Sequence, residues 1–341
     1  MRRQIHSVPF VLLCGLGAIA LSGCSAPNTA PAETSTANTP TATSSPAISS
    51  PATSSPAAAV RSDYSAVPLV PDSGVALGVY YGDGTQDETD NAIGVVPQIH
   101  LTYFGWEDPW TTDPVIESDA DEGRTSLVNW EPFGVDFADI VAGKHDDLLA
   151  ERAAEAASLP APVFLDFAAE MNEGEGWGDH QPDLYIDAYR HVHNAFEGKD
   201  GGNIVWVWAP NNTDSADAPP MLDYYPGDDY VDWTGIDGYN WGTAEPGFEW
   251  QSFSEVFRDA YNNLQPLGRP ILIGETASAD DGGSKAEWVE GIVPTLETEF
   301  PDIRAVVWFD VDKERDWRIR SSDAAEAAFR EMATSDLFHH G

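Results

Sequence analysis

The chain has 341 residues, of which 17 are Lys or Arg and 57 are Asp or Glu, so that its formal net charge is −40. Such a charge argues against nucleic acid as a partner and disfavours anionic substrates through long-range repulsion. A neutral polysaccharide is compatible with it. The excess of acidic residues is also typical of proteins from salty environments, where screening weakens self-repulsion.

The amino terminus has the pattern of an export signal. Arg2 and Arg3 precede an apolar run over residues 8–21, which is too short to span a bilayer comfortably. The run ends in Leu-Ser-Gly-Cys, the tetrad of bacterial lipoprotein signals. We therefore expect residues 1–23 to be removed and Cys24 to carry a lipid that anchors the exported protein to the extracellular face of the cell membrane. The alternative is an ordinary secretory signal.

Residues 24–65 are dominated by Ala, Ser, Thr and Pro, a composition that cannot bury enough apolar surface to offset the entropy of ordering. We expect this segment to be a linker and residues 66–341 to form one catalytic domain. Cys14 lies inside the signal, so the mature protein has no cysteine pair, no disulfide and no cysteine-based zinc site. No metal or cofactor is expected, and the protein is expected to be a monomer.

Apolar runs rich in β-forming residues recur along the domain with helical patterns between them. Eight such strands alternating with helices predict a parallel (β/α)8 barrel, the TIM-barrel fold of the α/β class. The expected strands are residues 74–81, 97–104, 125–130, 163–168, 203–209, 231–237, 270–274 and 304–309.

Several helices and one loop are indicated between these strands. Residues 107–124 are acidic and irregular, and we expect a long loop there. Pro182 suits the first turn of a helix, and Ser252 and Ser284 each open a capping-box pattern. Pro294 should break the helix that follows Ser284.

The active site of a (β/α)8 barrel lies at the carboxyl ends of its strands. The residues just past the expected strand ends are mostly acidic or aromatic, which is chemistry suited to carbohydrate. They are Glu131, Glu170, Trp208, Asn211, Asp237, Tyr239, Glu275, Trp308 and Asp310.

Two of these carboxylates follow apolar strands. The run PVFLDFAAEMN over residues 162–172 delivers Glu170, and PILIGETAS over residues 270–278 delivers Glu275. Glycoside hydrolysis needs two carboxyl groups that face one bond, of which one protonates the leaving oxygen and the other attacks the sugar or activates water. The ends of strands four and seven can supply this pair.

Several motifs in order over residues 78–333 resemble glycoside hydrolase family 26, the β-mannanase family of barrel glycosidases. The resemblance implies a retaining mechanism in which Glu170 is the acid/base and Glu275 is the nucleophile. The matching motifs are AEMN (169–172), WVWAPN (206–211), YYPGDDYVDWTGIDGYNW (224–241), ILIGETAS (271–278) and VVWFD with DWRI (306–319).

The resemblance also implies roles around the two carboxylates. Tyr239 would hydrogen-bond the nucleophile, Trp308 would be the platform under the sugar at the cleavage point, and Trp177 would contribute to a neighbouring subsite. From their positions we expect three further contacts with the substrate, at Asn172, Asn211 and Trp241.

Three positions depart from the family pattern. Ala169 stands where His usually precedes the acid/base, Asp166 stands in place of Arg, and Glu173 stands where Gly is common. The leading hypothesis is an endo-acting β-1,4-mannanase. Because Ala169 removes a substrate contact, a mixed-linkage β-glucanase or a β-xylanase is the alternative enzyme. A surface glycan-binding protein on a barrel without activity is the alternative outside enzymes.

Overall fold

In the computed structural model, the structure describes residues 62–82, 84–111, 113–173, 177, 180–244 and 246–338. The expected signal, the lipidation site Cys24 and nearly all of the expected linker lie outside these residues. Within the described part of the chain, no helix is both long enough and apolar enough to cross a membrane.

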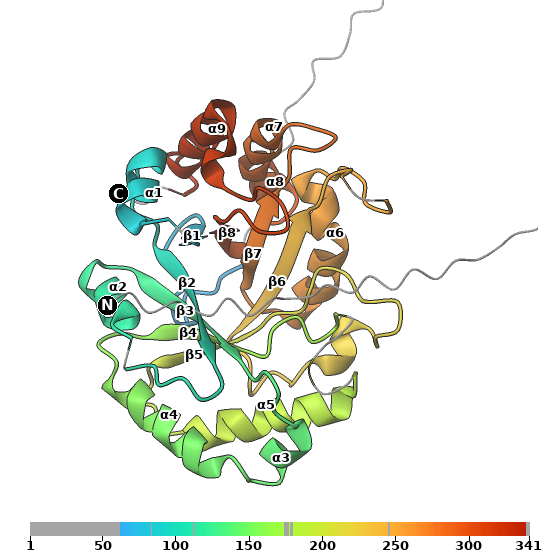
Figure 1. Ribbon diagram of the computed structural model, residues 1–341. Coiled ribbons are helices and arrows are strands. Elements are labelled where there is room, and N and C mark those ends of the chain that lie inside the picture. Colours follow the sequence, from blue (N-terminus) through green and yellow to red (C-terminus); the bar gives the residue numbers. More distant parts are fainter. Residues whose placement is uncertain are drawn as a thin grey trace, which may run out of the picture. The chain divides into compact units, whose positions relative to one another are not determined.

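The described residues form a closed barrel of eight parallel strands, which confirms the predicted (β/α)8 fold (Figure 1). Each strand pairs with the next one in the chain, and β8 closes the ring on β1. The strands are β1 (Ala76–Tyr80), β2 (Ile99–Gly105), β3 (Thr125–Glu131), β4 (Val163–Phe167), β5 (Ile204–Trp208), β6 (Trp233–Asn240), β7 (Ile271–Ser278) and β8 (Ile303–Phe309).

Helices surround the ring, with α4 and α5 packed together on one side and α7 and α9 on the other (Figure 1). They are α1 (Gln86–Ile93), α2 (Val115–Asp121), α3 (Phe137–Val141), α4 (Asp146–Ser158), α5 (Pro182–Phe196), α6 (Phe253–Leu264), α7 (Lys285–Glu290), α8 (Ile292–Thr298) and α9 (Asp323–Ala333). The large apolar side chains between helices and strands are almost fully buried.

The expected helix starts are confirmed. Ser252 and Glu255 form a complete capping box at α6, the Ser284 side chain caps α7, and Pro182 occupies the first turn of α5. The predicted break after Ser284 also occurs, but it lies at Gly291 and not at Pro294. A proline is tolerated in the first turn of a helix, where its missing N–H has no partner to lose.

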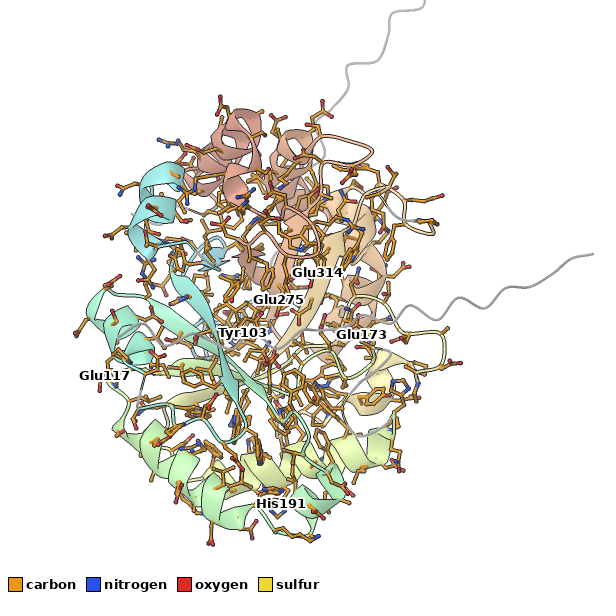
Figure 2. The ribbon with its side chains drawn as sticks, in the orientation of Figure 1. Tyr103, Glu117, Glu173, His191, Glu275 and Glu314 are labelled. Atoms are coloured by element: carbon orange, nitrogen blue, oxygen red, sulfur yellow. The ribbon has the colours of Figure 1, made fainter. Side chains whose placement is uncertain are left out.

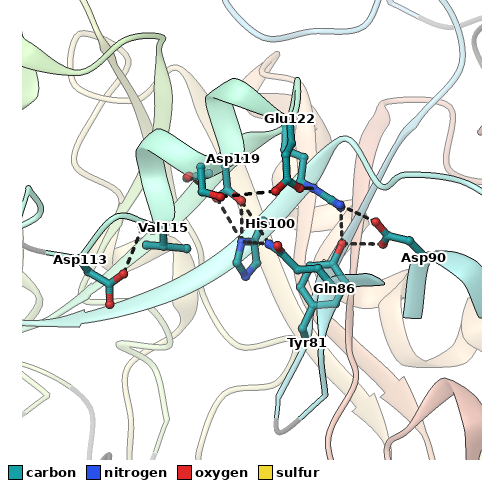
Figure 3. A network of polar contacts seen from close by, with 11 residues as sticks. Tyr81, Gln86, Asp90, His100, Asp113, Val115, Asp119 and Glu122 are labelled. Carbon is teal, nitrogen blue, oxygen red and sulfur yellow. Dashed lines mark hydrogen bonds and ion pairs between the residues drawn. The ribbon is translucent and has the colours of Figure 1, made fainter. Parts of the chain in front are cut away.

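Residues 107–124 are not wholly irregular, because they contain the short helix α2. A polar network holds this helix against the barrel (Figure 3). Asp119 accepts hydrogen bonds from Ser126 at 2.6 Å and from His100, whose Nδ1 lies 2.8 Å away. Beside them the buried Arg124 binds Asp90 of α1, so that α1 and α2 are tied to the same edge of the ring.

The segment before β1 covers the amino-terminal end of the barrel. The Ser62 amide donates to Asp302 at 3.3 Å, Trp233 Nε1 donates to the Pro68 carbonyl at 2.9 Å, and Tyr64 is buried. Trp233 and Asp302 lie at the starts of β6 and β8, on the face opposite the carboxyl ends of the strands. The folded domain therefore begins before residue 66, because Tyr64 and Ser62 already belong to it.

Candidate active site

Glu170 lies just past β4, in a backbone turn that few side chains adopt. Ala168 and Glu170 have φ angles of 54° and 56°, in the left-handed region. For residues other than Gly this conformation costs of the order of 1–3 kcal/mol and is concentrated at functional sites. The Ala168 amide donates to Trp130 of β3 and the Glu170 amide donates to Ala209 after β5. These two hydrogen bonds hold the turn and fix the carboxyl group at the mouth of the barrel.

Glu275 is positioned by a bulge in β7. Ile273 and Glu275 lie opposite the consecutive residues Ile236 and Asp237 of β6, so Gly274 is an extra residue without a partner there. The pairing with β8 shifts at the same place. A bulge re-aims the following side chain, and bulges are common beside active sites. Gly274 is also required sterically, because a Cβ there would lie 2.6 Å from Oδ1 of Asp237.

Two phenol groups hold the Glu275 carboxylate. Tyr239 of β6 donates to Oε2 at 2.6 Å, as the resemblance implied, and Tyr103 of β2 donates to Oε1. Figure 2 shows Tyr103 and Glu275 together at the centre of the barrel. Burial raises the pKa of Glu275, and both tyrosines act in the opposite direction. Tyr103 was missed from sequence, although a Tyr near the carboxyl end of an expected strand was a usable signal.

The surroundings of Glu170 favour its protonated form. Its pKa is raised well above the ordinary value by burial, then by the nearby charges of Glu173 and Glu275. Asn211 donates to Oε1 at 2.8 Å, which opposes this shift and orients the carboxyl group. The structure thus places Asn211 beside Glu170, and its contact with substrate stays a prediction. The pair of carboxyl groups is electrostatically unequal, since only Glu275 accepts two hydroxyl donors.

Two further acids lie beneath this pair. Asp166 of β4 and Asp237 of β6 are 2% and 1% exposed, and Oδ1 of each is buried without a hydrogen-bond partner among the described residues. Burial, followed by the charge of Glu275, raises the pKa of both well above the ordinary value. Their surroundings therefore favour the protonated, neutral form of both side chains. The described side chains include no group of three His, Cys, Asp or Glu that could hold a metal ion.

Glu131 at the end of β3 extends the acidic rim. Burial, followed by the charge of Glu275, raises its pKa to about 7, while Lys313 acts in the opposite direction. Lys313 follows β8 and lies over the Phe309 ring at 5.8 Å. It also lowers the pKa of Glu275. The rim is thus strongly acidic, with one lysine close enough to affect two of its carboxyl groups.

The expectation that Trp308 is a sugar platform is wrong. Its side chain is 1% exposed and packs outside the barrel against Trp288 of α7 and Phe329 of α9. Successive residues of a strand face opposite sides, so it is Phe309 that faces the mouth, where its ring contacts Tyr239. Trp208, also placed on the rim from sequence, is fully buried.

The expectation that Asn172 contacts substrate is wrong, because its side chain is fully buried and its amide group already has hydrogen-bond partners. Its side chain donates to Asp214 at 2.9 Å and accepts from the Asn211 amide at 2.8 Å. Asn172 therefore holds the loop that presents Asn211. Asp310 is buried as well, and it accepts from the Ile319 amide at 2.7 Å.

Trp177 and Trp241 are half-buried, and they follow β4 and β6 at the mouth of the barrel. Trp177 Nε1 donates to the Ala169 carbonyl at 2.6 Å. Trp241 follows β6 and packs against Trp317 and Phe248, with Arg315 5.5 Å from its ring. Both positions leave ring surface accessible, so their contact with substrate stays a prediction.

An eight-stranded parallel barrel with two carboxyl groups of unequal environment past β4 and on β7 has the architecture of a barrel glycoside hydrolase. The profile of glycosyl hydrolase family 26 matches residues 140–261, which include Glu170, Asn211 and Tyr239. The barrel is a member of glycoside hydrolase family 26, as the motifs predicted.

The chain also resembles curated proteins in sequence and a solved structure in fold. Endoglucanase H of Acetivibrio thermocellus is 33% identical over 277 residues, which are 76% of this chain and 30% of that protein. Beta-1,3-xylanase TXYA of a Vibrio species is 25% identical over 58% of this chain and 44% of its own length. A Bacillus subtilis mannanase structure, 17% identical, superposes with a TM-score of 0.56 over 78% of this chain and 86% of its own. The chain thus spans less than half the length of either curated relative.

Proposed function

We propose that the barrel is a retaining endo-β-glycanase that hydrolyses a neutral β-linked polysaccharide. The observation that carries the proposal is the unequal environment of two carboxyl groups at one mouth. Glu275 accepts hydrogen bonds from Tyr103 and Tyr239, which favours its anion. Burial and neighbouring negative charge keep the proton on Glu170.

These states match the two roles of a double displacement. The Glu275 carboxylate attacks the anomeric carbon while Glu170 gives its proton to the departing glycosidic oxygen. This step leaves a glycosyl ester on Glu275. Glu170, now ionised, takes a proton from water, and the hydroxyl attacks the same carbon and releases Glu275. Asn211 holds the Glu170 carboxyl group through both steps.

Aromatic side chains beside each of the two carboxyl groups support endo action. Trp177 donates to Ala169, next to Glu170, and Trp241 contacts Tyr239, which donates to Glu275. We infer from this that sugar rings are bound on both sides of the cleavage point. An exo-acting enzyme needs one side to be closed. Exposed aromatic rings bind the apolar faces of sugars and place no demand on charge.

The substrate proposed first is a mixed-linkage β-glucan, the alternative that the sequence left open beside β-xylan. The relative with 33% identity bears the name endoglucanase, and Ala169 lacks the side chain that family members usually offer at that position. β-1,4-Mannan, the leading expectation from sequence, is the second candidate, and the solved mannanase supports it only through its fold. A binding protein without activity is disfavoured because both carboxyl groups retain their separate environments.

We also propose that Cys24 carries a lipid anchor, on the evidence of the Leu-Ser-Gly-Cys tetrad alone. Radiolabelled palmitate supplied to cells that express the chain should be incorporated into it. A Cys24→Ala variant should remain unlabelled and be released into the medium. Label on the variant, or none on the wild type, would exclude the anchor.

The test of activity uses the purified chain with mixed-linkage glucan, galactomannan, xylan and carboxymethyl cellulose. Reducing ends should appear with one neutral polymer, and Glu275→Ala should lose activity roughly 10⁴-fold or more. Proton NMR of the first product should show the β anomer if configuration is retained. Azide should rescue Glu275→Ala with an α-glycosyl azide and Glu170→Ala with a β-glycosyl azide. A first product in the α configuration would contradict the retaining mechanism.

A further inference from the structure

Phe133 is a large apolar side chain exposed at the mouth of the barrel. It follows β3 by two residues and is 46% exposed. Its ring lies against that of Trp177, with centroids 4.9 Å apart and planes tilted by 58°. Two aromatic rings from different loops therefore form one partly accessible apolar surface.

This surface is fixed relative to the acid. Trp177 Nε1 donates to the carbonyl of Ala169 at 2.6 Å, and Ala169 immediately precedes Glu170. The backbone amide of Glu170 itself donates to the Ala209 carbonyl at 2.8 Å. The position of the indole is thus set by the same turn that sets the carboxyl group.

The topology shows on which side of the cleaved bond this surface lies. The strands run in order around the ring, so β3 lies across the barrel from β7, which carries Glu275. The Phe133–Trp177 surface follows β3 and β4, on the acid's side. A retaining hydrolase protonates the oxygen of the leaving group, so the leaving sugar rests on the side of the acid.

Polar groups complete the surface. The carboxyl groups of Glu131 and Glu173 are half-buried, and neither accepts a hydrogen bond from the residues that the structure describes. Glu173 is joined to the acid's turn, since its amide donates to the Glu170 carbonyl at 3.0 Å. Free carboxyl oxygens are acceptors suited to the hydroxyl groups of a sugar.

We propose that Phe133 and Glu173, together with Trp177, form the subsite for the leaving-group sugar. The inference rests on the proposed hydrolysis and adds to it the side of the cleavage point on which these residues act. The Phe133 ring covers one face of the leaving sugar, and the Glu173 carboxyl group accepts from its hydroxyls. Both contacts are made only when the leaving group is a sugar.

The test compares two substrates that share their glycone and differ in the leaving group. One is a β-linked oligosaccharide of the polymer that the wild type cleaves, and the other is the corresponding β-glycosyl fluoride, whose leaving group is a single atom. Phe133→Ala should lower kcat/KM for the oligosaccharide about tenfold, the loss expected when one aromatic face is uncovered. Activity on the fluoride should stay within about twofold of the wild type. Phe133→Tyr, which keeps the ring, should behave as the wild type on both.

Glu173→Gln should lower the oligosaccharide affinity of the Glu275→Gln variant, a measurement that does not depend on proton transfer from Glu170. Matched controls are Val96→Ala, an apolar side chain 57% exposed before β2 on the other face of the barrel, and Glu117→Gln on α2. Neither control variant should change the activity on either substrate. Equal losses on both substrates, or no loss on the oligosaccharide, would overturn the subsite assignment.

Binding separates this inference from the proposed function. Calorimetry would measure oligosaccharide affinity for Glu275→Gln with and without Phe133→Ala. A folded wild type that cleaves neither substrate would refute hydrolysis, while an affinity that falls about tenfold with Phe133→Ala would retain the sugar-binding surface. Unchanged affinity would refute that surface as well.

Discussion

The Glu275 carboxylate, the nucleophile of the proposed mechanism, receives its hydrogen bonds from neutral donors. Tyr103 and Tyr239 both donate to Glu275, whereas the buried position beneath it holds Asp166. Hydrogen bonds to a charged group contribute about 1.5–3 kcal/mol each, more than those between neutral groups. Two phenols can therefore supply much of the stabilisation that a buried cation would otherwise give.

Removal of one phenol should weaken this stabilisation. Tyr103→Phe should lower kcat/KM about 10–100-fold, the kinetic equivalent of one hydrogen bond to a charge. The pKa of Glu275 should rise, so the acid limb of the pH profile should move to higher pH. Tyr225→Phe is the control, since that hydroxyl bonds Asp228 at the surface at 2.9 Å. An unmoved acid limb would contradict the role of Tyr103.

A second prediction concerns Asp166 and the dependence of stability on pH. The burial of Asp166 favours its neutral, protonated form. The folded state keeps this proton at pH values where the unfolded chain has lost it. The folded state therefore binds more protons above the ordinary pKa of 3.8, and stability falls as the pH rises through that range. Asp166→Asn is always neutral and should melt at a higher temperature than the wild type at pH 8, with little difference near pH 4. A difference in melting temperature between variant and wild type that is the same at every pH would exclude this explanation.

At the scale of single residues, sequence identified both carboxyl groups and Tyr239 because they follow long apolar strands. It placed Trp308 on the wrong face, since strand alternation predicts which residues share a side but not which side is inner. Asn172 was misassigned because the sequence alone does not distinguish an asparagine that is buried in a loop from one that binds sugar. Both errors concern direction, which depends on tertiary packing.

At the scale of elements, irregularities place the catalytic groups. The left-handed residues after β4 aim Glu170, and the bulge at Gly274 aims Glu275. Strands and helix caps were predictable, because hydrophobic periodicity and capping residues are local signals. The bulge was not, since it exists only relative to the register of β6 and β8. Helix α2 was missed because its acidic sequence lacks a clear periodicity.

Gly274→Ala tests the bulge. The new Cβ would lie 2.6 Å from Oδ1 of the buried Asp237, so β7 or the Asp237 side chain must move. Overpacking of this kind costs about 1–3 kcal/mol. We expect lower stability in urea denaturation and a larger loss of kcat than of substrate affinity, since Glu275 follows directly. Wild-type kcat in the variant would show that the bulge tolerates a side chain.

At the scale of the molecule, the net negative charge is the feature with the clearest consequence for stability. With a net charge of −40, like charges repel one another throughout the folded protein. Raising KCl from about 0.05 M to 1 M shortens the screening length to about 3 Å and should raise the melting temperature. Sucrose at equal osmolality is the control for effects other than screening. A melting temperature that is independent of salt would show that repulsion has little influence on stability.

The segment that covers the amino-terminal end of the barrel has a consequence for the proposed lipid anchor at Cys24. Ser62 donates to Asp302 on the face opposite Glu170 and Glu275. Under that proposal, the attachment would reach the barrel from the end opposite the mouth. It would then not compete with a long polymer for the surface around the two carboxyl groups.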